Sequence, residues 1–233
     1  MTTIRPPIPV TCIDRPLTGG LVCPYVNVQL ADGGVDFRTA HHARYERCWT
    51  DGLCQTCGSQ LAGLAVLFGG PNQLRDRKFT EPPLCGPCAL YASQACPMVA
   101  GRMNAYADRQ TVAEGTRGRT CPDPGCDCGG YVAADPDAKG SPGDPAHPWY
   151  ALWVRPGMYK VTANRAVVRC SDRGCEHDRL LVNGALLVGE PLKGFLVSDP
   201  SAGRIWKRLH SSALAVLLGP APDLAQLEKA VLP

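Results

Sequence analysis

Thirteen cysteines constrain the fold of this 233-residue chain more than any other feature of its sequence. Their odd number rules out complete disulfide pairing within one chain. Residues 1–10 carry three prolines and no apolar segment of the kind found in a signal peptide. No run approaches the ~18–20 apolar residues of a membrane span. We therefore expect a cytoplasmic protein, in which thiols stay reduced and clustered cysteines bind metal.

Four of the cysteines form two Cys-x2-Cys pairs, Cys54 with Cys57 and Cys85 with Cys88. Gly58 directly follows the first pair, which is typical of a zinc knuckle, a tight turn that directs both thiolates at one ion. Four thiolates fill a tetrahedral zinc site completely and leave no position for a water molecule. The spacing therefore predicts a closed zinc site whose metal stabilises the fold.

The segments around these pairs predict a treble-clef-like zinc finger, in the order knuckle, hairpin and helix. Leu61–Phe68 is apolar and bounded by glycines, as expected for one arm of a hairpin. Ala89–Ala95 has helical character, and Pro87 suits the first turn of a helix because its missing N–H is not needed there. Thiolates at such a helix N-terminus are favoured by the helix dipole.

The distal cysteines form an internal repeat with a spacing of 49 residues. Each copy reads Cys-x-Asp-x-Gly-Cys, followed by an acidic residue and then by a cysteine or a histidine. Two knuckles that each precede a short apolar run predict a zinc-ribbon-like mini-sheet, so we expect about two zinc ions per chain. The expected ligands are Cys121, Cys126, Cys170 and Cys175, and the alternative ligands are Cys128 and His177, which occupy matching places in the repeat.

Four further cysteines, Cys12, Cys23, Cys48 and Cys96, have no such partners in the sequence. We expect Cys23 and Cys96 to be buried as small apolar residues. Cys48 is near the first knuckle along the chain and is the expected substitute ligand.

Short elements dominate the rest of the sequence, in keeping with its 25 glycines and 22 prolines. The predicted fold class is α+β, with a treble-clef-like zinc lobe over residues 1–115 and a zinc-ribbon-like β lobe with C-terminal helices over residues 116–233. Pro71–Thr80 is expected to be a basic connection. Expected strands are Leu21–Leu30, Val35–Arg38, Trp149–Trp153, Tyr159–Val168 and Phe195–Ser198, and expected helices are Val99–Glu114, Ser201–Leu218 and Asp223–Leu232.

Residues 24–105 carry a set of short motifs that resembles an uncharacterised family of small zinc-binding proteins from actinobacteria and their phages. The motifs are Pro24-Tyr25-Val26, Asp36-Phe37-Arg38, Leu53-Cys54-x-x-Cys57-Gly58, Glu81-Pro82-Pro83 through Cys88-Ala89, and Ala95-Cys96-Pro97. The family usually has His at the position of Cys85, so the resemblance implies a mixed Cys/His zinc site that has become all-thiolate here. It also implies an actinobacterial or phage setting, and the host cytoplasm if a phage encodes the chain. The resemblance implies no enzymatic reaction.

Basic residues suggest nucleic acid as the partner of a non-catalytic zinc module. Cationic groups beside an aromatic ring suit contact with phosphates together with stacking on bases, although a net charge of +3 adds little to this hypothesis. The candidate groups are Arg75, Arg77 and Lys78; Arg102, Arg109, Arg117 and Arg119; and Arg204, Lys207 and Arg208 beside Trp206.

Two alternative functions stay open from the sequence. A protein–protein adaptor that binds a host factor could use the aromatic residues Trp149, Tyr150, Trp153 and Tyr159. A treble-clef nuclease would need a histidine base on the hairpin or helix, yet no histidine lies between Cys57 and Cys96. His41 and His42 precede the motif and would face opposite ways in a strand. We therefore name no catalytic residue and no cofactor other than zinc.

Overall fold

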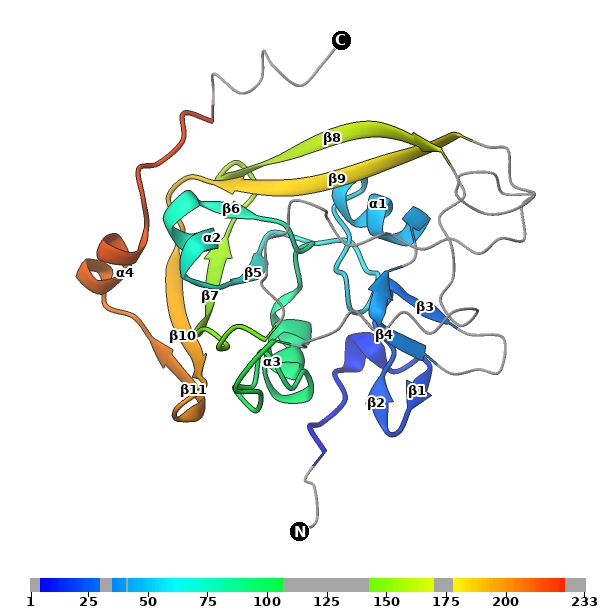
Figure 1. Cartoon of the computed structure of the whole chain (residues 1–233), viewed down its shortest axis with the longest axis horizontal. Coiled ribbons are helices and arrows are strands. Elements are labelled where there is room, and N and C mark those ends of the chain that lie inside the picture. Colours follow the sequence, from blue (N-terminus) through cyan, green and yellow to red (C-terminus); the bar gives the residue numbers. More distant parts are fainter. Residues whose placement is uncertain (1–4, 30–34, 41, 107–142, 170–177, 225–233) are drawn as a thin grey trace.

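The computed structural model describes residues 5–29, 35–40, 42–106, 143–169 and 178–224, and over these it is a mixed α+β structure with small sheets and short helices (Figure 1). A central antiparallel sheet has the strand order β11-β10-β7-β5. Its strands are β5 (Ala65–Gly69), β7 (Trp149–Val154), β10 (Lys193–Asp199) and β11 (Gly203–Arg208). No helix among the described residues is long and apolar enough to cross a membrane.

The central sheet is covered on both faces, which explains why every residue of β5 is buried. Successive side chains of a strand point to opposite faces. Val66 and Phe68 therefore belong to one buried cluster, which they share with helix α3 (Gly86–Ala95). Leu67 belongs to a second cluster on the other face, which it shares with Leu152 of β7 and Leu214 of helix α4 (Ser211–Leu217). We call these faces the α3 face and the α4 face.

A second antiparallel sheet, with the order β6-β9-β8, contributes to the α4 face. β8 (Tyr159–Arg169) and β9 (Asp178–Val188) pair from end to end and form the long arm at the top of Figure 1. The short strand β6 (Lys78–Phe79) pairs with β9. Phe79 and Leu186 from this sheet are fully buried in the cluster.

The N-terminal segment adds small elements beside α3. The 3-10 helix η1 (Val10–Cys12) is followed by a hairpin of β1 (Leu17–Thr18) and β2 (Leu21–Val22). The hairpin turns at Gly19 and Gly20, whose φ angles of 58° and 77° suit glycine. β3 (Asn27–Gln29) pairs with β4 (Val35–Ala40), and α1 (His42–Thr50) then leads toward the first cysteine pair.

Several sequence-based predictions of secondary structure are confirmed. β7, β8 and β10 cover the strands expected at Trp149–Trp153, Tyr159–Val168 and Phe195–Ser198. α3 contains the expected Ala89–Ala95, with proline in its first turn. It ends before Pro97, which cannot donate the backbone hydrogen bond that a longer helix would need.

The helix predicted over Ser201–Leu218 is wrong for most of its length. The Asp199 carboxylate accepts hydrogen bonds from the backbone N–H of Ser201 at 2.9 Å and from its hydroxyl at 2.6 Å, which turns the chain. β11 then pairs with β10, and this ladder outweighs the helical periodicity. Only α4 is helical there, and His210 caps it by accepting a hydrogen bond from the Ser212 N–H.

Two further predictions need correction. The expected connection Pro71–Thr80 contains helix α2 (Pro71–Asp76) and β6. Of the helix predicted over Val99–Glu114, residues 99–101 form turns and residues 102–106 are not helical, and the remainder lies outside the described residues. Most of the predicted helix Asp223–Leu232 lies outside the described residues.

The predicted division into residues 1–115 and 116–233 does not separate two sheets. β5 pairs with β7 from Ala65 opposite Val154 to Gly69 opposite Tyr150, so the central sheet contains strands from both segments. β6 likewise pairs with β9. The expected hairpin arm at Leu61–Phe68 therefore finds its main partner far along the chain, and only a single bridge joins Val66 to Leu84 locally.

Candidate metal centre

The structure brings together the four cysteines predicted from the two Cys-x2-Cys pairs. The sulfur atoms of Cys54, Cys57, Cys85 and Cys88 all lie within 4.8 Å of one another, and those of Cys57 and Cys85 are 4.0 Å apart. Zinc–sulfur bonds of about 2.3 Å in a tetrahedron place neighbouring sulfurs about 3.8 Å apart. Cys54 and Cys88 are buried, and Cys57 and Cys85 are partly buried. The donor set and its spacing fit one zinc ion.

The first pair lies in a tight turn that the backbone closes on itself. The Gly58 N–H donates to the Cys54 carbonyl at 2.8 Å, and the Cys54 N–H donates to the Ser59 carbonyl at 2.8 Å. Gly58 has a φ of 78°, and a Cβ atom at this position would lie 2.7 Å from the Tyr25 ring. Glycine is therefore required here by both the backbone conformation and the space.

The Pro82-Pro83 segment and the loop after β2 hold this turn from two sides. Gln55 donates its backbone N–H to the Pro83 carbonyl at 3.0 Å and its side-chain amide to the Pro82 carbonyl at 2.6 Å. On the other side, the Tyr25 N–H donates to the Thr56 carbonyl at 2.9 Å. These contacts fix the first cysteine pair relative to the second.

The second pair lies at the start of α3. Cys85 is the N-cap residue of the helix, and its carbonyl accepts the Ala89 N–H at 2.9 Å. The Cys85 N–H also donates to the Cys54 sulfur at 3.3 Å. Val66 and Leu84 exchange backbone hydrogen bonds of 2.8 and 2.9 Å, which ties the start of α3 to β5. A negatively charged thiolate is favoured at this helix end by the dipole.

The thiols of the four-cysteine cluster influence one another strongly. Hydrogen bonds within the cluster, first of all with Cys54, lower the pKa of Cys57 below its ordinary range and that of Cys85 to about 7. The same contacts raise the pKa of Cys54 and Cys88, with Cys57 as the main cause for Cys54 and Cys54 as the main cause for Cys88. Four thiolates cannot share this space without a compensating cation, and a divalent metal would supply that charge.

A fifth cysteine contacts the cluster, and it is Cys12 instead of the expected Cys48. The Cys12 sulfur lies 3.6 Å from that of Cys88, and Cys12 is fully buried. Cys48 lies in α1 and packs in a cluster with Val26 and Leu53, where burial raises its pKa to about 12. No signal in the sequence marks Cys12, because it precedes Cys88 by 76 residues.

The other predicted cysteines divide into two groups. Cys23 is buried as expected, whereas Cys96 is only partly buried at the C-terminal end of α3. The second zinc site was predicted from Cys121, Cys126, Cys170 and Cys175, with Cys128 and His177 as alternatives, and all six lie outside the described residues.

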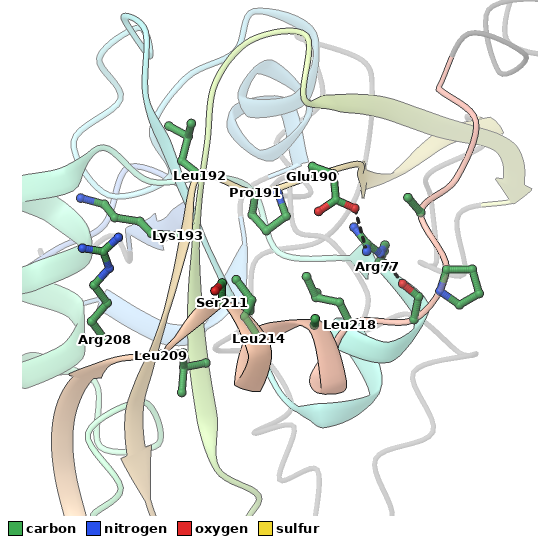
Figure 2. A pocket seen from close by; sticks show the side chains of 14 residues that line it. Arg77, Glu190, Pro191, Leu192, Lys193, Arg208, Leu209, Ser211, Leu214 and Leu218 are labelled. Carbon is green, nitrogen blue, oxygen red and sulfur yellow. Dashed lines mark hydrogen bonds and ion pairs between the residues drawn. The ribbon is translucent and has the colours of Figure 1, made fainter.

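The basic group Arg75, Arg77 and Lys78 does not form one exposed surface. Arg75 and Lys78 are exposed, but Arg77 is only 6 % exposed. The Arg77 guanidinium donates to the Gly219 carbonyl at 2.6 Å, to the Gly189 carbonyl, and to Glu190 at 3.1 Å, as Figure 2 shows in part. Arg77 therefore joins elements of the fold and is not available to a phosphate.

The same arginine lies at the edge of a cavity of about 450 Å³ beside α4 (Figure 2). The lining consists mainly of apolar residues such as Leu192, Leu214 and Leu218, and it also includes Lys193 and Arg208. The Arg77 guanidinium is already hydrogen-bonded within the fold, so it is not free to bind a ligand in this cavity.

Aromatic and cationic side chains gather on the α3 face of the central sheet. Phe195 stacks on Trp206 with ring centroids 5.4 Å apart and an interplanar angle of 20°, and it contacts Trp153 at 6.3 Å. The Lys193 ammonium lies 4.3 Å from the Trp153 ring centroid, and the Arg204 guanidinium lies 5.9 Å from that of Trp206. We call this set, together with Arg208, the aromatic–cation strip.

Strand register decides which of the predicted basic residues share this strip. Arg208 lies opposite Phe195, so it shares the α3 face. Lys207 lies opposite Leu196 and therefore points to the α4 face. Figure 2 shows Lys193 and Arg208 side by side, on the side of the strands away from Leu214 and Leu218.

A β-bulge sets the position of Trp206. One residue of β10, Val197, faces two residues of β11, Ile205 and Trp206. Trp206 has a φ of 52°, a conformation that bulky side chains rarely adopt. Such strain persists only where the surrounding structure imposes it, and it concentrates at functional sites.

No protein-family model, curated protein or solved structure matches this chain. The family resemblance of residues 24–105 therefore stays a prediction, and the function has to be argued from the residues themselves.

Proposed function

We propose that this protein is a non-catalytic, zinc-stabilised module that binds single-stranded nucleic acid through the aromatic–cation strip. The observation that carries the proposal is the ladder of Trp153, Phe195 and Trp206 with cations beside its rings. Aromatic rings offer stacking surfaces to bases of any sequence, and neighbouring cations neutralise the phosphates.

The metal centre supports a structural role for zinc. Four converging thiolates close the coordination sphere, so no open position remains for a catalytic water molecule. The local order of the chain is also compatible with a treble clef: a cysteine turn, the Val66–Leu84 bridge, and a second cysteine pair at a helix start. We therefore propose that the four-cysteine segment is a treble clef.

The strip and the metal centre are neighbours, which gives the zinc a role in binding. Trp153, Phe195 and Trp206 pack against the same cluster that contains Cys54 and Cys88. Gly86 lies between the two cysteines of the second pair, and a Cβ atom on it would lie 3.2 Å from the Trp153 ring. The metal fixes the start of α3, and α3 in turn supports the strip.

Charge and accessibility on the strip suit a phosphate backbone. Arg204 and Arg208 are exposed, while Lys193 and the rings of Trp153 and Trp206 are partly buried. Partial burial holds the rings in one arrangement, so little side-chain entropy remains to be lost on stacking.

The proposal is tested by fluorescence anisotropy with labelled single-stranded DNA and RNA oligonucleotides at low salt. Trp206→Ala should weaken binding by about 1–3 kcal/mol, roughly 5- to 150-fold in Kd, since it removes one stacking platform. Phe37→Ala is the matched control, because Phe37 is an exposed aromatic residue on β4, in a different sheet. Equal affinity of the two variants would contradict the proposal.

A salt titration tests the cations separately. Each phosphate contact to a single strand contributes about −0.7 to the slope of log K against log salt. The double variant Arg204→Gln/Arg208→Gln should therefore flatten the slope by roughly 1.4. Lys207→Gln should leave the slope unchanged because its side chain points to the α4 face. Absence of binding to any oligonucleotide at low salt would favour a protein partner for the strip.

A further inference from the structure

Cys12 is a buried thiol whose position the four-cysteine site does not explain. It lies in η1 and is 0 % exposed, although its neighbours Val10 and Ile13 are 87 % and 72 % exposed. Its sulfur is 3.6 Å from that of Cys88, and the Thr11 hydroxyl oxygen is 3.5 Å from the same sulfur. The only part of η1 that is buried therefore points at a metal ligand.

The spacing between Cys12 and Cys88 is that of two ligands on one ion. Neighbouring sulfurs around a tetrahedral zinc are about 3.8 Å apart, close to the 3.6 Å observed here. Cys12 is nevertheless not among the four sulfurs that all lie within 4.8 Å of one another. It stands beside one corner of the tetrahedron and is not itself a corner.

We propose that Cys12 is a reserve ligand of the metal centre, which takes the coordination position of Cys88 when the Cys88 sulfur is lost. The inference rests on the zinc centre proposed above and is independent of nucleic-acid binding. Cys12 lies outside the tetrad, and its sulfur contacts a tetrad sulfur, that of Cys88.

The backbone hydrogen bonds that hold the turn around Cys12 are local to that turn. η1 is a single turn, held by the Cys12 N–H on the Pro9 carbonyl at 2.8 Å and the Ile13 N–H on the Val10 carbonyl at 3.1 Å. These bonds are local, so a shift of the whole turn preserves them.

The inference predicts an asymmetry among the four ligands. Substitution of Cys88 leaves four thiols for the ion, whereas substitution of Cys85 leaves only three within reach. Replacement by alanine as well as by serine is informative, because alanine leaves room for the Cys12 sulfur to approach.

The experiment compares the full-length variants Cys88→Ser, Cys88→Ala, Cys85→Ser and Cys12→Ser/Cys88→Ala, purified with zinc. Zinc per chain is counted relative to the wild type, so that ions held elsewhere cancel. We expect wild-type zinc content in at least one of the two Cys88 variants, and one ion fewer in both Cys85→Ser and the double variant. Substituted Co²⁺ should give the wild-type thiolate-to-metal absorption in the retaining variant.

Two results overturn the inference. One is the loss of an ion, or of the folded state, from both Cys88 variants to the same extent as from Cys85→Ser. The other is retention of the ion by the double variant. A different result, full zinc content in both Cys85→Ser and the double variant, would refute the four-thiolate centre itself, on which the zinc part of the proposed function depends.

Discussion

Arg77 offers a sharp test of how this fold is held together, because sequence and structure assign it opposite roles. In the sequence it stands between Arg75 and Lys78 as part of an apparent basic surface. In the structure its guanidinium hydrogen-bonds the carbonyls of Gly189 and Gly219 and pairs with Glu190. It thereby joins the end of α2 to the segments that follow β9 and α4.

The cost of removing this group follows from its contacts. Arg77→Met retains the aliphatic stem and the same backbone φ of 50°, so packing and strain change little. A hydrogen bond from a charged donor is worth about 1.5–3 kcal/mol, and the buried Gly189 carbonyl loses its donor. Glu190 is 77 % exposed, so its ion pair adds little. We expect a loss of roughly 2–4 kcal/mol, allowing for hydration of the less buried Gly219 carbonyl.

Urea denaturation with zinc present measures this loss, and Arg75→Met is the matched control. The Arg75 side chain is 66 % exposed and its only described partner is the neighbouring Asp76, so its removal should leave the midpoint unchanged. Arg77→Lys should lose most of the stabilisation too, because one ammonium cannot reach three separate acceptors. Equal midpoints for Arg77→Met and Arg75→Met would refute the structural role of Arg77.

Three further predictions concern a strained residue, a glycine and a buried thiol. Trp206→Gly should be more stable than Trp206→Ala by roughly 1 kcal/mol in urea denaturation, because only glycine adopts a φ of 52° freely. A more stable Trp206→Ala variant would contradict the strained backbone at this bulge. Gly58→Ala should abolish zinc retention against a chelator, because the added Cβ would meet Tyr25. The control Gly52→Ala should keep the ion, because nothing lies within 4 Å of its Cβ. Similar zinc retention in the two variants would count against the role of Gly58. Burial holds the pKa of Cys48 at about 12, above the ordinary 9.0, so its stabilising effect is complete below pH 9 and lost as pH rises toward 12. Cys48→Ala should therefore flatten the alkaline decline in stability, and an unchanged decline would argue against a buried thiol.

The four-cysteine cluster was predictable from the sequence because the signals that specify it are local. A Cys-x2-Cys pair with a following glycine fixes its own turn, and a second pair at a helix start fixes its own orientation. Only the packing of the two cysteine pairs against each other depends on contacts between distant parts of the chain. Cys12 carries no such local signal, since its approach to Cys88 depends on how η1 packs against α3.

The errors in the fold have the same origin. β5 finds its partner in β7, beyond residues 107–142, and no local pattern specifies that pairing. Gly203–Arg208 carries a helical periodicity, yet the turn at Asp199 and the ladder with β10 outweigh it. In the sequence Arg77 cannot be distinguished from the basic residues beside it. In the structure the left-handed turn at the end of α2 directs its side chain inward.

The zinc content and ligand shell of a chain without the second predicted site test the central claim most directly. In this variant Cys121, Cys126, Cys128, Cys170 and Cys175 become serine and His177 becomes alanine. X-ray absorption of the purified chain should show one zinc ion with four sulfur ligands at about 2.3 Å. A chain that retains no zinc, or a shell that contains nitrogen or oxygen, would contradict a closed site formed by Cys54, Cys57, Cys85 and Cys88.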